Sequence, residues 1–290
     1  MRMDDYRESD NVEDRRGGGG GGISFGGGRL GIGSIVIALV ASYFLGVNPM
    51  TVLNLLSGGG MPVVQQQAPA QRPPANDETA VFVSKVLAST EDTWIPAFRE
   101  MGKQYKEPRL VLYTGVTPTA CGTGQAAMGP FYCPGDQKVY IDLAFFRELR
   151  ERFHAPGEFA QAYVVAHEVG HHVQHLLGIS DQVHQAQQRA SEAQANALSV
   201  RLELQADCLA GVWGKRTDSM AQVLEPGDVE AALTAASAIG DDRLQQQAQG
   251  RIVPDSFTHG SSAQRMRWFQ RGFDSGDFRQ CNTFDKSARL

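Results

Sequence analysis

Two histidines and a glutamate near the middle of the chain have the residue types and the spacing of a metal site. They stand in the run Ala166-His-Glu-Val-Gly-His-His. On a helix, His167 and His171 project from one face because they are four residues apart, so both imidazoles can bind one zinc ion. Glu168 then lies beside the ion, where it can accept a proton from a water molecule that the metal activates. The pattern predicts a hydrolytic site for Zn²⁺.

A motif this short also occurs by chance, in helices whose histidines are ordinary core or surface residues. Residues 158–177 argue against chance, because they are rich in valine, alanine and aromatic residues and contain no proline. Gly178 follows them, as is typical of a helix C-terminus. These features predict a largely buried helix. Polar groups on a buried helix need partners, and one metal ion supplies a partner to several of them.

A catalytic zinc ion needs a third protein ligand, and an acidic pair on a second predicted helix can supply it. Residues 198–213 carry an apolar stripe at helical spacing, with Glu203 and Asp207 beside it. We predict Glu203 as the third ligand. Asp207 is expected to accept the ring N–H of a ligand histidine and so to fix its tautomer. The alternative is a solvated acidic face. The longer metzincin motif is absent, because Gln174 and Leu177 replace its glycine and histidine.

Six blocks of sequence, taken in order, resemble the bacterial family of neutral zinc metallopeptidases of the YpfJ type. The blocks are Ala120-Cys-Gly-Thr-Gly, Gly129-Pro-Phe-Tyr-Cys-Pro, Ala166-His-Glu-Val-Gly-His-His-Val-Gln174, Glu203-Leu-Gln-Ala-Asp-Cys208, Gly240-Asp-Asp-Arg243 and Phe257-Thr-His-Gly-Ser261. The likeness covers nearly the whole chain. The order His-Glu-x-x-His followed by Glu-x-x-x-Asp is also similar to gluzincin peptidases of the membrane-associated M48 kind. The resemblance implies a zincin-like peptidase acting on peptides or proteins, with the same three ligands and Glu168 as general base.

His259 precedes a helix start that is marked by the capping box Ser261-x-x-Gln264. By analogy with M48-like enzymes, His259 can hydrogen-bond the oxyanion that develops on the attacked carbonyl, which is a catalytic role. The alternative is a loop histidine that bonds to the backbone. Tyr140 and Tyr163 compete for the oxyanion role. The remaining histidines are expected at the surface: His154, His172, His175 and His184.

An uncharged stretch over residues 30–47 is just long enough to cross a bilayer as a helix. Because 29 residues precede it, we expect a retained transmembrane anchor rather than a cleaved signal peptide. Arginines occur before the stretch, and neither lysine nor arginine follows it until Arg72, which favours a cytoplasmic N-terminus. The sequence therefore predicts a single-pass protein of the bacterial inner membrane with a periplasmic catalytic domain. The alternative is a buried helix of a soluble domain.

The predicted anchor divides the chain into four parts. Residues 1–29 are expected to be a disordered, glycine-rich cytoplasmic head, and residues 48–76 a flexible linker. The metallopeptidase domain is expected at residues 77–290. Within this domain a helix is predicted at 79–105 and strands at 109–114 and 137–143. The expected fold class is α+β, mainly helical with a small sheet. An extended substrate can add to a sheet edge near the metal, beside residues 126–132 or 137–143.

The four cysteines are consistent with an extracytoplasmic domain, because disulfides persist in oxidising compartments. Of the three possible pairings, we predict Cys121 with Cys133 and Cys208 with Cys281. Reduced core thiols are the alternative. The net charge is −5, which gives no basic surface for nucleic acid.

The leading hypothesis is a membrane-anchored, zinc-dependent peptidase that cleaves peptide bonds with metal-activated water. The alternative is a non-catalytic binding or scaffold protein of the bacterial envelope in which the zinc ion is structural. Such a zinc ion requires a fourth protein ligand and gives Glu168 no function, so the sequence favours the enzyme.

Overall fold

The computed structural model describes residues 1–16, 72–125, 129–285 and 287–290. The predicted anchor at residues 30–47 lies outside the described residues, as does most of the predicted linker at 48–76. Among the helices that are described, none combines the length and the apolar character that a bilayer crossing requires.

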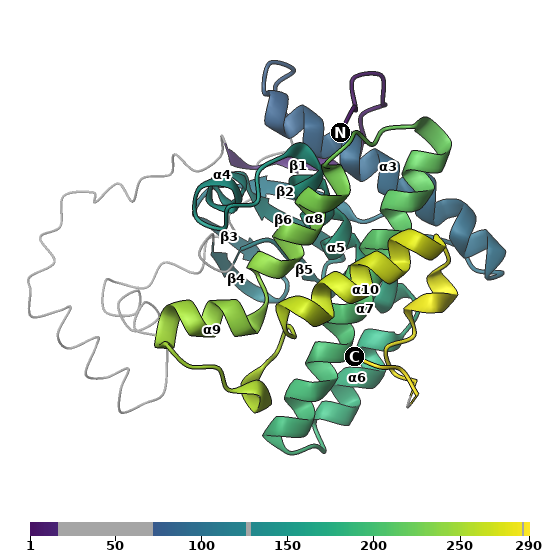
Figure 1. Cartoon of the computed structure of the whole chain (residues 1–290). Coiled ribbons are helices and arrows are strands. Elements are labelled where there is room, and N and C mark those ends of the chain that lie inside the picture. The colour runs from purple at the N-terminus through teal and green to yellow at the C-terminus, as the bar shows by residue number, and fades with distance from the viewer. Residues whose placement is uncertain (17–71, 126–128, 286) are drawn as a thin grey trace, which may run out of the picture. The chain divides into compact units, whose positions relative to one another are not determined.

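Helices make up most of the described chain (Figure 1). The α-helices are α3 (Glu78–Glu100), α4 (Ala144–Glu151), α5 (Glu158–Leu176), α6 (Ile179–Gln187), α7 (Glu192–Ala221), α8 (Asp228–Ala238), α9 (Asp241–Gln249) and α10 (Ser262–Ser275). Two 3-10 turns, η3 (Pro254–Ser256) and η4 (Phe278–Cys281), flank α10. The helix predicted at residues 158–177 is confirmed. The helix predicted at 198–213 is the middle of the longer α7.

A four-stranded sheet packs on these helices with the strand order β1-β2-β6-β5. The strands are β1 (Val12–Asp14), β2 (Arg109–Tyr113), β5 (Phe131–Cys133) and β6 (Lys138–Asp142). The β1, β2 and β6 strands are parallel, whereas β5 is antiparallel to β6. A separate hairpin consists of β3 (Val116–Thr119) and β4 (Gly122–Gln125). The predicted α+β class, mainly helical with a small sheet, is confirmed.

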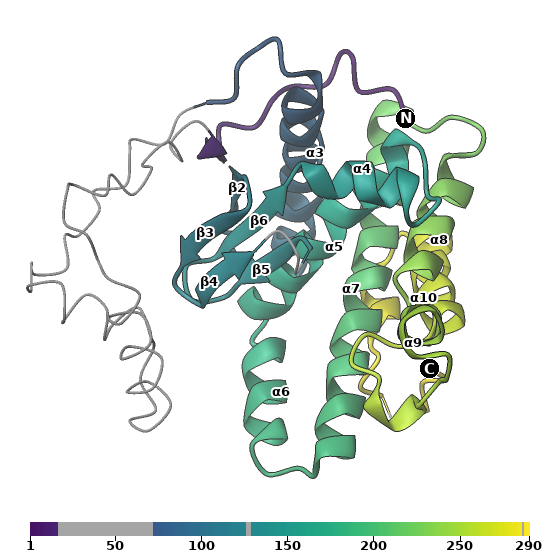
Figure 2. The ribbon, with the colours of Figure 1, turned by 90° about the vertical axis from the view of Figure 1, so that its left-hand side faces the viewer.

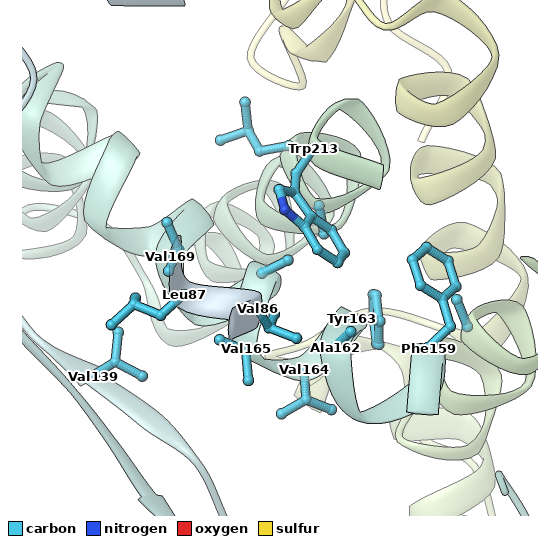
Figure 3. Close-up of a cluster of buried hydrophobic side chains, with 14 of the residues drawn as sticks. Val86, Leu87, Val139, Phe159, Ala162, Tyr163, Val164, Val165, Val169 and Trp213 are labelled. Carbon is cyan, nitrogen blue, oxygen red and sulfur yellow. The ribbon is translucent and has the colours of Figure 1, made fainter. Parts of the chain in front are cut away.

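Helix α5 lies at the centre of the fold. Figure 2 shows the sheet on one side of it and α7, α8 and α10 on the other. Its apolar side chains, among them Val165 and Val169, gather with Leu87 of α3 and Val139 of β6 in the core (Figure 3). This burial on all sides explains why valine, alanine and aromatic residues occur on every face of the helix. The polar groups of α5 are consequently surrounded by packed side chains.

Two glycines allow the helices around α5 to approach one another closely. A Cβ atom on Gly170, directly before the second histidine, would lie 3.1 Å from the carbonyl oxygen of Ala206 on α7. A Cβ atom on Gly272 of α10 would lie only 1.9 Å from the carbonyl oxygen of Cys208. Glycine at these two positions therefore lets α7 contact α5 on one side and α10 on the other.

Residues 1–16 are part of the folded domain. Their strand β1 pairs with β2, and Met3 and Val12 are buried. The prediction of a disordered head over residues 1–29 is therefore wrong for its first part, and the domain is not confined to residues 77–290.

Polar contacts hold this N-terminal strand in place. Glu13 is only 6% exposed, and its carboxylate lies 2.9 Å from the Lys138 ammonium and 3.1 Å from the Arg109 guanidinium. Such contacts leave no apolar periodicity in the sequence, which explains why the segment resembled a disordered head. A single membrane crossing at residues 30–47 would place β1 and β2 on opposite sides of the bilayer. The predicted orientation thus conflicts with this strand pairing.

Candidate metal centre

Three side chains from two helices converge at one point. His167 and His171 come from α5, and Glu203 comes from α7. The Nε2 atom of His167 lies 3.2 Å from one Glu203 oxygen, and the Nε2 atom of His171 lies 3.4 Å from the other. Ligands at about 2.1 Å from a tetrahedral zinc ion are roughly 3.4 Å apart, so this donor set fits zinc in chemistry and in spacing.

The charges of these three groups favour one another. Burial raises the pKa of Glu203, but the nearby imidazoles of His171 and His167 outweigh it, and the pKa falls well below its usual range. Burial lowers the pKa of His167, but the carboxylates of Asp207 and Glu203 outweigh it and raise the pKa to about 10. The pocket thus stabilises positive charge at the imidazoles, which is the charge that a divalent cation brings.

Asp207 orients His167, as the sequence predicted. Its Oδ1 atom lies 2.9 Å from Nδ1 of His167, and the carboxylate is completely buried. Arg265 of α10 donates to both carboxylate oxygens at 2.9 Å, and the Tyr163 hydroxyl donates to Oδ1 at 2.5 Å. An ionised carboxylate can only accept hydrogen bonds, so His167 donates from Nδ1. Nε2 is then the nitrogen that a metal ion can bind once its proton is displaced.

Arg265 was missed in the sequence. The residue is 2% exposed, and its guanidinium also lies within 3.2 Å of the Tyr163 hydroxyl. A buried aspartate requires a cationic partner, so Asp207 was a signal that such a residue exists. Nothing in the sequence near residue 265 identified Arg265 as that partner.

Gln174 orients the second histidine of this cluster, His171. The Nδ1 atom of His171 lies 2.9 Å from Oε1 of Gln174, whose Nε2 donates to the Leu202 carbonyl at 2.7 Å. Because the Leu202 carbonyl can only accept, it fixes which end of the amide faces His171. His171 therefore donates from Nδ1 and keeps its Nε2 lone pair for a metal ion. The sequence showed Gln174 only as a missing metzincin glycine, although its spacing of three residues from His171 was a usable signal.

A cleft of about 650 Å³ opens onto the three converging side chains. The carboxyl group of Glu168 lines it and is nearly buried, and this burial raises its pKa although His171 and His167 act to lower it. A carboxylate with a raised pKa is suited to accept a proton and release it again. Apolar residues make up much of the cleft lining, including Pro130, Phe131, Phe145, Phe153, Ile239 and Leu244.

His259 lies at the same cleft, and Asp241 of α9 holds it there. The Nδ1 atom of His259 lies 3.2 Å from Oδ1 of Asp241, whose Oδ2 accepts from the backbone N–H groups of Thr258, His259 and Gly260. The hydrogen bond to Asp241 raises the pKa of His259, against the effect of burial. Within the part of the chain that the structure describes, no hydrogen bond is formed by the opposite ring nitrogen, Nε2.

The two competing tyrosines are engaged elsewhere. Tyr163 donates its proton to Asp207, and Tyr140 donates to Asp136 at 2.7 Å. Tyr140 is also not among the residues that line the cleft.

The expectation of a surface position is wrong for His172, which is completely buried. Burial lowers its pKa to about 4, so the ring is neutral. Its Nε2 donates to the Lys106 carbonyl at 2.6 Å, and its Nδ1 accepts from the Tyr132 hydroxyl at 2.9 Å. The sequence could not show this, because β5 and residue 106 reach the histidine only in the fold. His172 thereby positions Tyr132, which lines the cleft.

Both predicted disulfides are confirmed. Cys121 is bonded to Cys133, which ties the β3–β4 hairpin to β5. Cys208 is bonded to Cys281, which ties α7 to η4.

Known proteins similar to this chain support a single family. The family described as "Putative neutral zinc metallopeptidase" matches residues 1–284. The chain is 56% identical, over 294 aligned positions, to the Escherichia coli (strain K12) protein named "Uncharacterized protein YpfJ", covering 99% of this chain and 100% of that protein. It is 42% identical over 213 positions to "Uncharacterized protein Rv2575" of Mycobacterium tuberculosis (strain ATCC 25618 / H37Rv), covering 70% and 71%. No solved structure matches the chain. The chain belongs to this family of neutral zinc metallopeptidases.

Proposed function

We propose that the protein is a zinc-dependent peptidase with a zincin-like active site. The observation that carries the proposal is the meeting of His167, His171 and Glu203 at an open cleft that Glu168 also lines. Among the described residues this cluster has three members, and three protein ligands leave one coordination position open. When bound, zinc supplies a Lewis acid that activates water and polarises a carbonyl near neutral pH.

The protein's own residues then move the protons. Glu168 takes a proton from the attacking water and passes it to the nitrogen of the broken peptide bond. His259 donates a hydrogen bond from Nε2 to the oxyanion in its imidazolium form, which the hydrogen bond from Nδ1 to Asp241 favours. The positions of both side chains at the cleft support these roles.

The substrate is proposed to bind as an extended peptide beside β5. In the described sheet, β6 has neighbours on both sides, so the 137–143 strand cannot accept another. The β5 strand is at the edge, and its Phe131 and Tyr132 line the cleft. Backbone hydrogen bonds to this edge would hold a peptide across the metal ligands.

We also propose that the peptidase domain is extracytoplasmic, which the two disulfides support. Contact with the lipid bilayer through residues 30–47 remains part of the proposal. Because β1 pairs with β2, we place residues 1–16 in the same compartment as the domain, instead of in the cytoplasm. A membrane-impermeant maleimide should therefore label Glu8→Cys and Glu230→Cys alike in cells with a permeabilised outer membrane. If only position 230 is labelled, residues 1–16 lie in the cytoplasm, as the predicted single membrane crossing requires.

The catalytic proposal is tested by metal analysis and peptide cleavage with the full chain and Glu168→Gln. We expect this variant to retain zinc and to lose roughly 10²- to 10⁴-fold in kcat. Glu230→Gln, a change of the same type at an exposed position on α8, should retain full activity. If Glu168→Gln cleaves as fast as the parent, the assignment of the base is wrong.

The alternative is a structural zinc in an envelope scaffold protein. It predicts metal-dependent folding with no turnover of any peptide by the parent chain, and a fourth protein ligand.

A further inference from the structure

We propose that the Cys208–Cys281 disulfide helps to orient His171 through a buried relay of two glutamine amides. The proposal rests on the metal site described above. The relay runs from His171 to Gln174, from Gln174 to Gln205, and from Gln205 to the carbonyl group of Cys281. It links a metal ligand on α5 to the segment that follows α10.

Each contact in the relay is a hydrogen bond of ordinary length. His171 Nδ1 is 2.9 Å from Gln174 Oε1, and Gln174 Nε2 is 3.0 Å from Gln205 Oε1. Gln205 Nε2 then lies 2.9 Å from the carbonyl oxygen of Cys281. Both amides are buried, with Gln174 completely inaccessible and Gln205 only 6% exposed.

The direction of the relay is set at its far end by the Cys281 carbonyl and, at Gln174, also by the Leu202 carbonyl. The Cys281 carbonyl can only accept, so Gln205 must present its NH₂ group there and its oxygen to Gln174. Gln174 must then present its NH₂ group to Gln205 and its oxygen to His171. The imidazole therefore donates from Nδ1, which leaves the Nε2 lone pair for the metal ion. The Leu202 carbonyl supports the same orientation of Gln174.

The disulfide holds the far end against α7. Cys208 is buried and lies three residues after Gln205 on that helix, so both anchor points of the Cys281 segment are on α7. The Thr283 hydroxyl adds a hydrogen bond to the Arg201 carbonyl at 2.6 Å. If the Cys281 carbonyl moves, the Gln205 amide is left buried without an acceptor, which is unfavourable enough to make it rotate. Gln205 is thus a positioning residue, acting on the metal site through Gln174.

Zinc affinity of the full chain, measured by competition with a chelator, tests the relay without requiring turnover. We expect Cys208→Ser/Cys281→Ser to bind zinc about tenfold more weakly, in line with the loss of an outer partner of a metal ligand. Cys121→Ser/Cys133→Ser is the matched control. It removes the other disulfide, whose cysteines form no hydrogen bond to the relay residues. Only zinc affinity is compared, because Cys133 lies in β5, and this affinity should equal that of the parent.

Gln205→Leu keeps the disulfide and should weaken zinc binding by a similar factor. Because both changes break the same relay, adding Gln205→Leu to Cys208→Ser/Cys281→Ser should cause little further loss. The absorption spectrum of bound Co²⁺ should change in these variants, whereas a purely structural role of the disulfide would leave it as in the parent.

Unchanged zinc affinity in Gln205→Leu overturns the relay, and this variant decides the matter even if the cysteine variant does not fold. Fully additive losses in the combined variant also overturn it. Failure of the proposed function would look different, because the parent chain itself would then bind no zinc or cleave no peptide.

Discussion

The two histidines of the proposed metal site are supported in chemically different ways. His167 donates to an ionised carboxylate, Asp207, which Arg265 holds from α10. His171 donates to a neutral amide, Gln174, on its own helix. Both supports engage Nδ1 and leave Nε2 as the nitrogen for a metal ion, so a charge is not needed to select between the two ring nitrogens.

The difference concerns what else each support does. The Asp207–Arg265 pair is completely buried and joins α7 to α10, so it is part of the core as well as of the site. An anionic partner also makes an imidazole more basic, which an amide does much less. We therefore expect the His167 side to couple the site to folding and to pH, and the His171 side to affect mainly metal affinity.

The largest effect is expected from Asp207→Ala. This change leaves the guanidinium of Arg265 buried without its partner, which should lower the free energy of unfolding by roughly 3–5 kcal/mol. Urea denaturation of the metal-free chain measures it. In the double variant Asp207→Leu/Arg265→Met both charges are gone, so much of the lost stability should return. If the single variant is as stable as the parent, the Asp207–Arg265 ion pair does not stabilise the core.

A smaller effect on stability, but a clear effect on zinc, is expected from Gln174→Leu. The imidazole of His171 loses its acceptor, so zinc affinity should fall by roughly 10- to 100-fold. The free energy of unfolding should fall by about 1–3 kcal/mol, because no charge is left unpaired. Gln182→Leu, the same substitution at an exposed position on α6, should change neither quantity. If Gln174→Leu loses more stability than Asp207→Ala, the His167 side is not the one that couples the site to folding.

Features set by local geometry could be predicted from the sequence. The helix at residues 158–177 followed from its valine, alanine and aromatic residues, the absence of proline and a terminal glycine, and it is observed as α5. The capping box at Ser261 and Gln264 is present with both of its hydrogen bonds. The approach of Glu203 to both histidines required one further inference, that two acidic residues on a second helix need a cation.

Features that depend on contacts between distant segments could not be predicted. Arg265 lies 58 residues after Asp207, and no spacing rule connects residues on different helices. Val12 pairs with Leu110, yet strand pairing through backbone hydrogen bonds leaves little trace in a short polar segment. His172 is buried because Tyr132 and Lys106 surround it, and only the fold brings them there.

The pH dependence of zinc binding should distinguish the contributions of the two histidines. The pKa of His167 is raised to about 10, mainly by Asp207 acting against burial. Near neutral pH and without zinc, both ring nitrogens of His167 are therefore protonated and the ring is positively charged. Zinc must displace the proton from Nε2. Zinc affinity should therefore fall as the pH falls, and rise by about tenfold per pH unit for each proton released, up to that pKa.

Asp207→Asn gives His167 a neutral amide partner like that of His171. The pKa of His167 should then fall, so fewer protons are displaced near neutral pH and the slope of zinc affinity against pH should become shallower. Gln174→Leu should keep the parent's slope, because the carboxylate of Glu203, acting against burial, is the chief group that raises the pKa of His171. Chelator competition at several pH values measures both slopes. Equal slopes in the parent and Asp207→Asn would show that the charge of Asp207 does not set the basicity of His167.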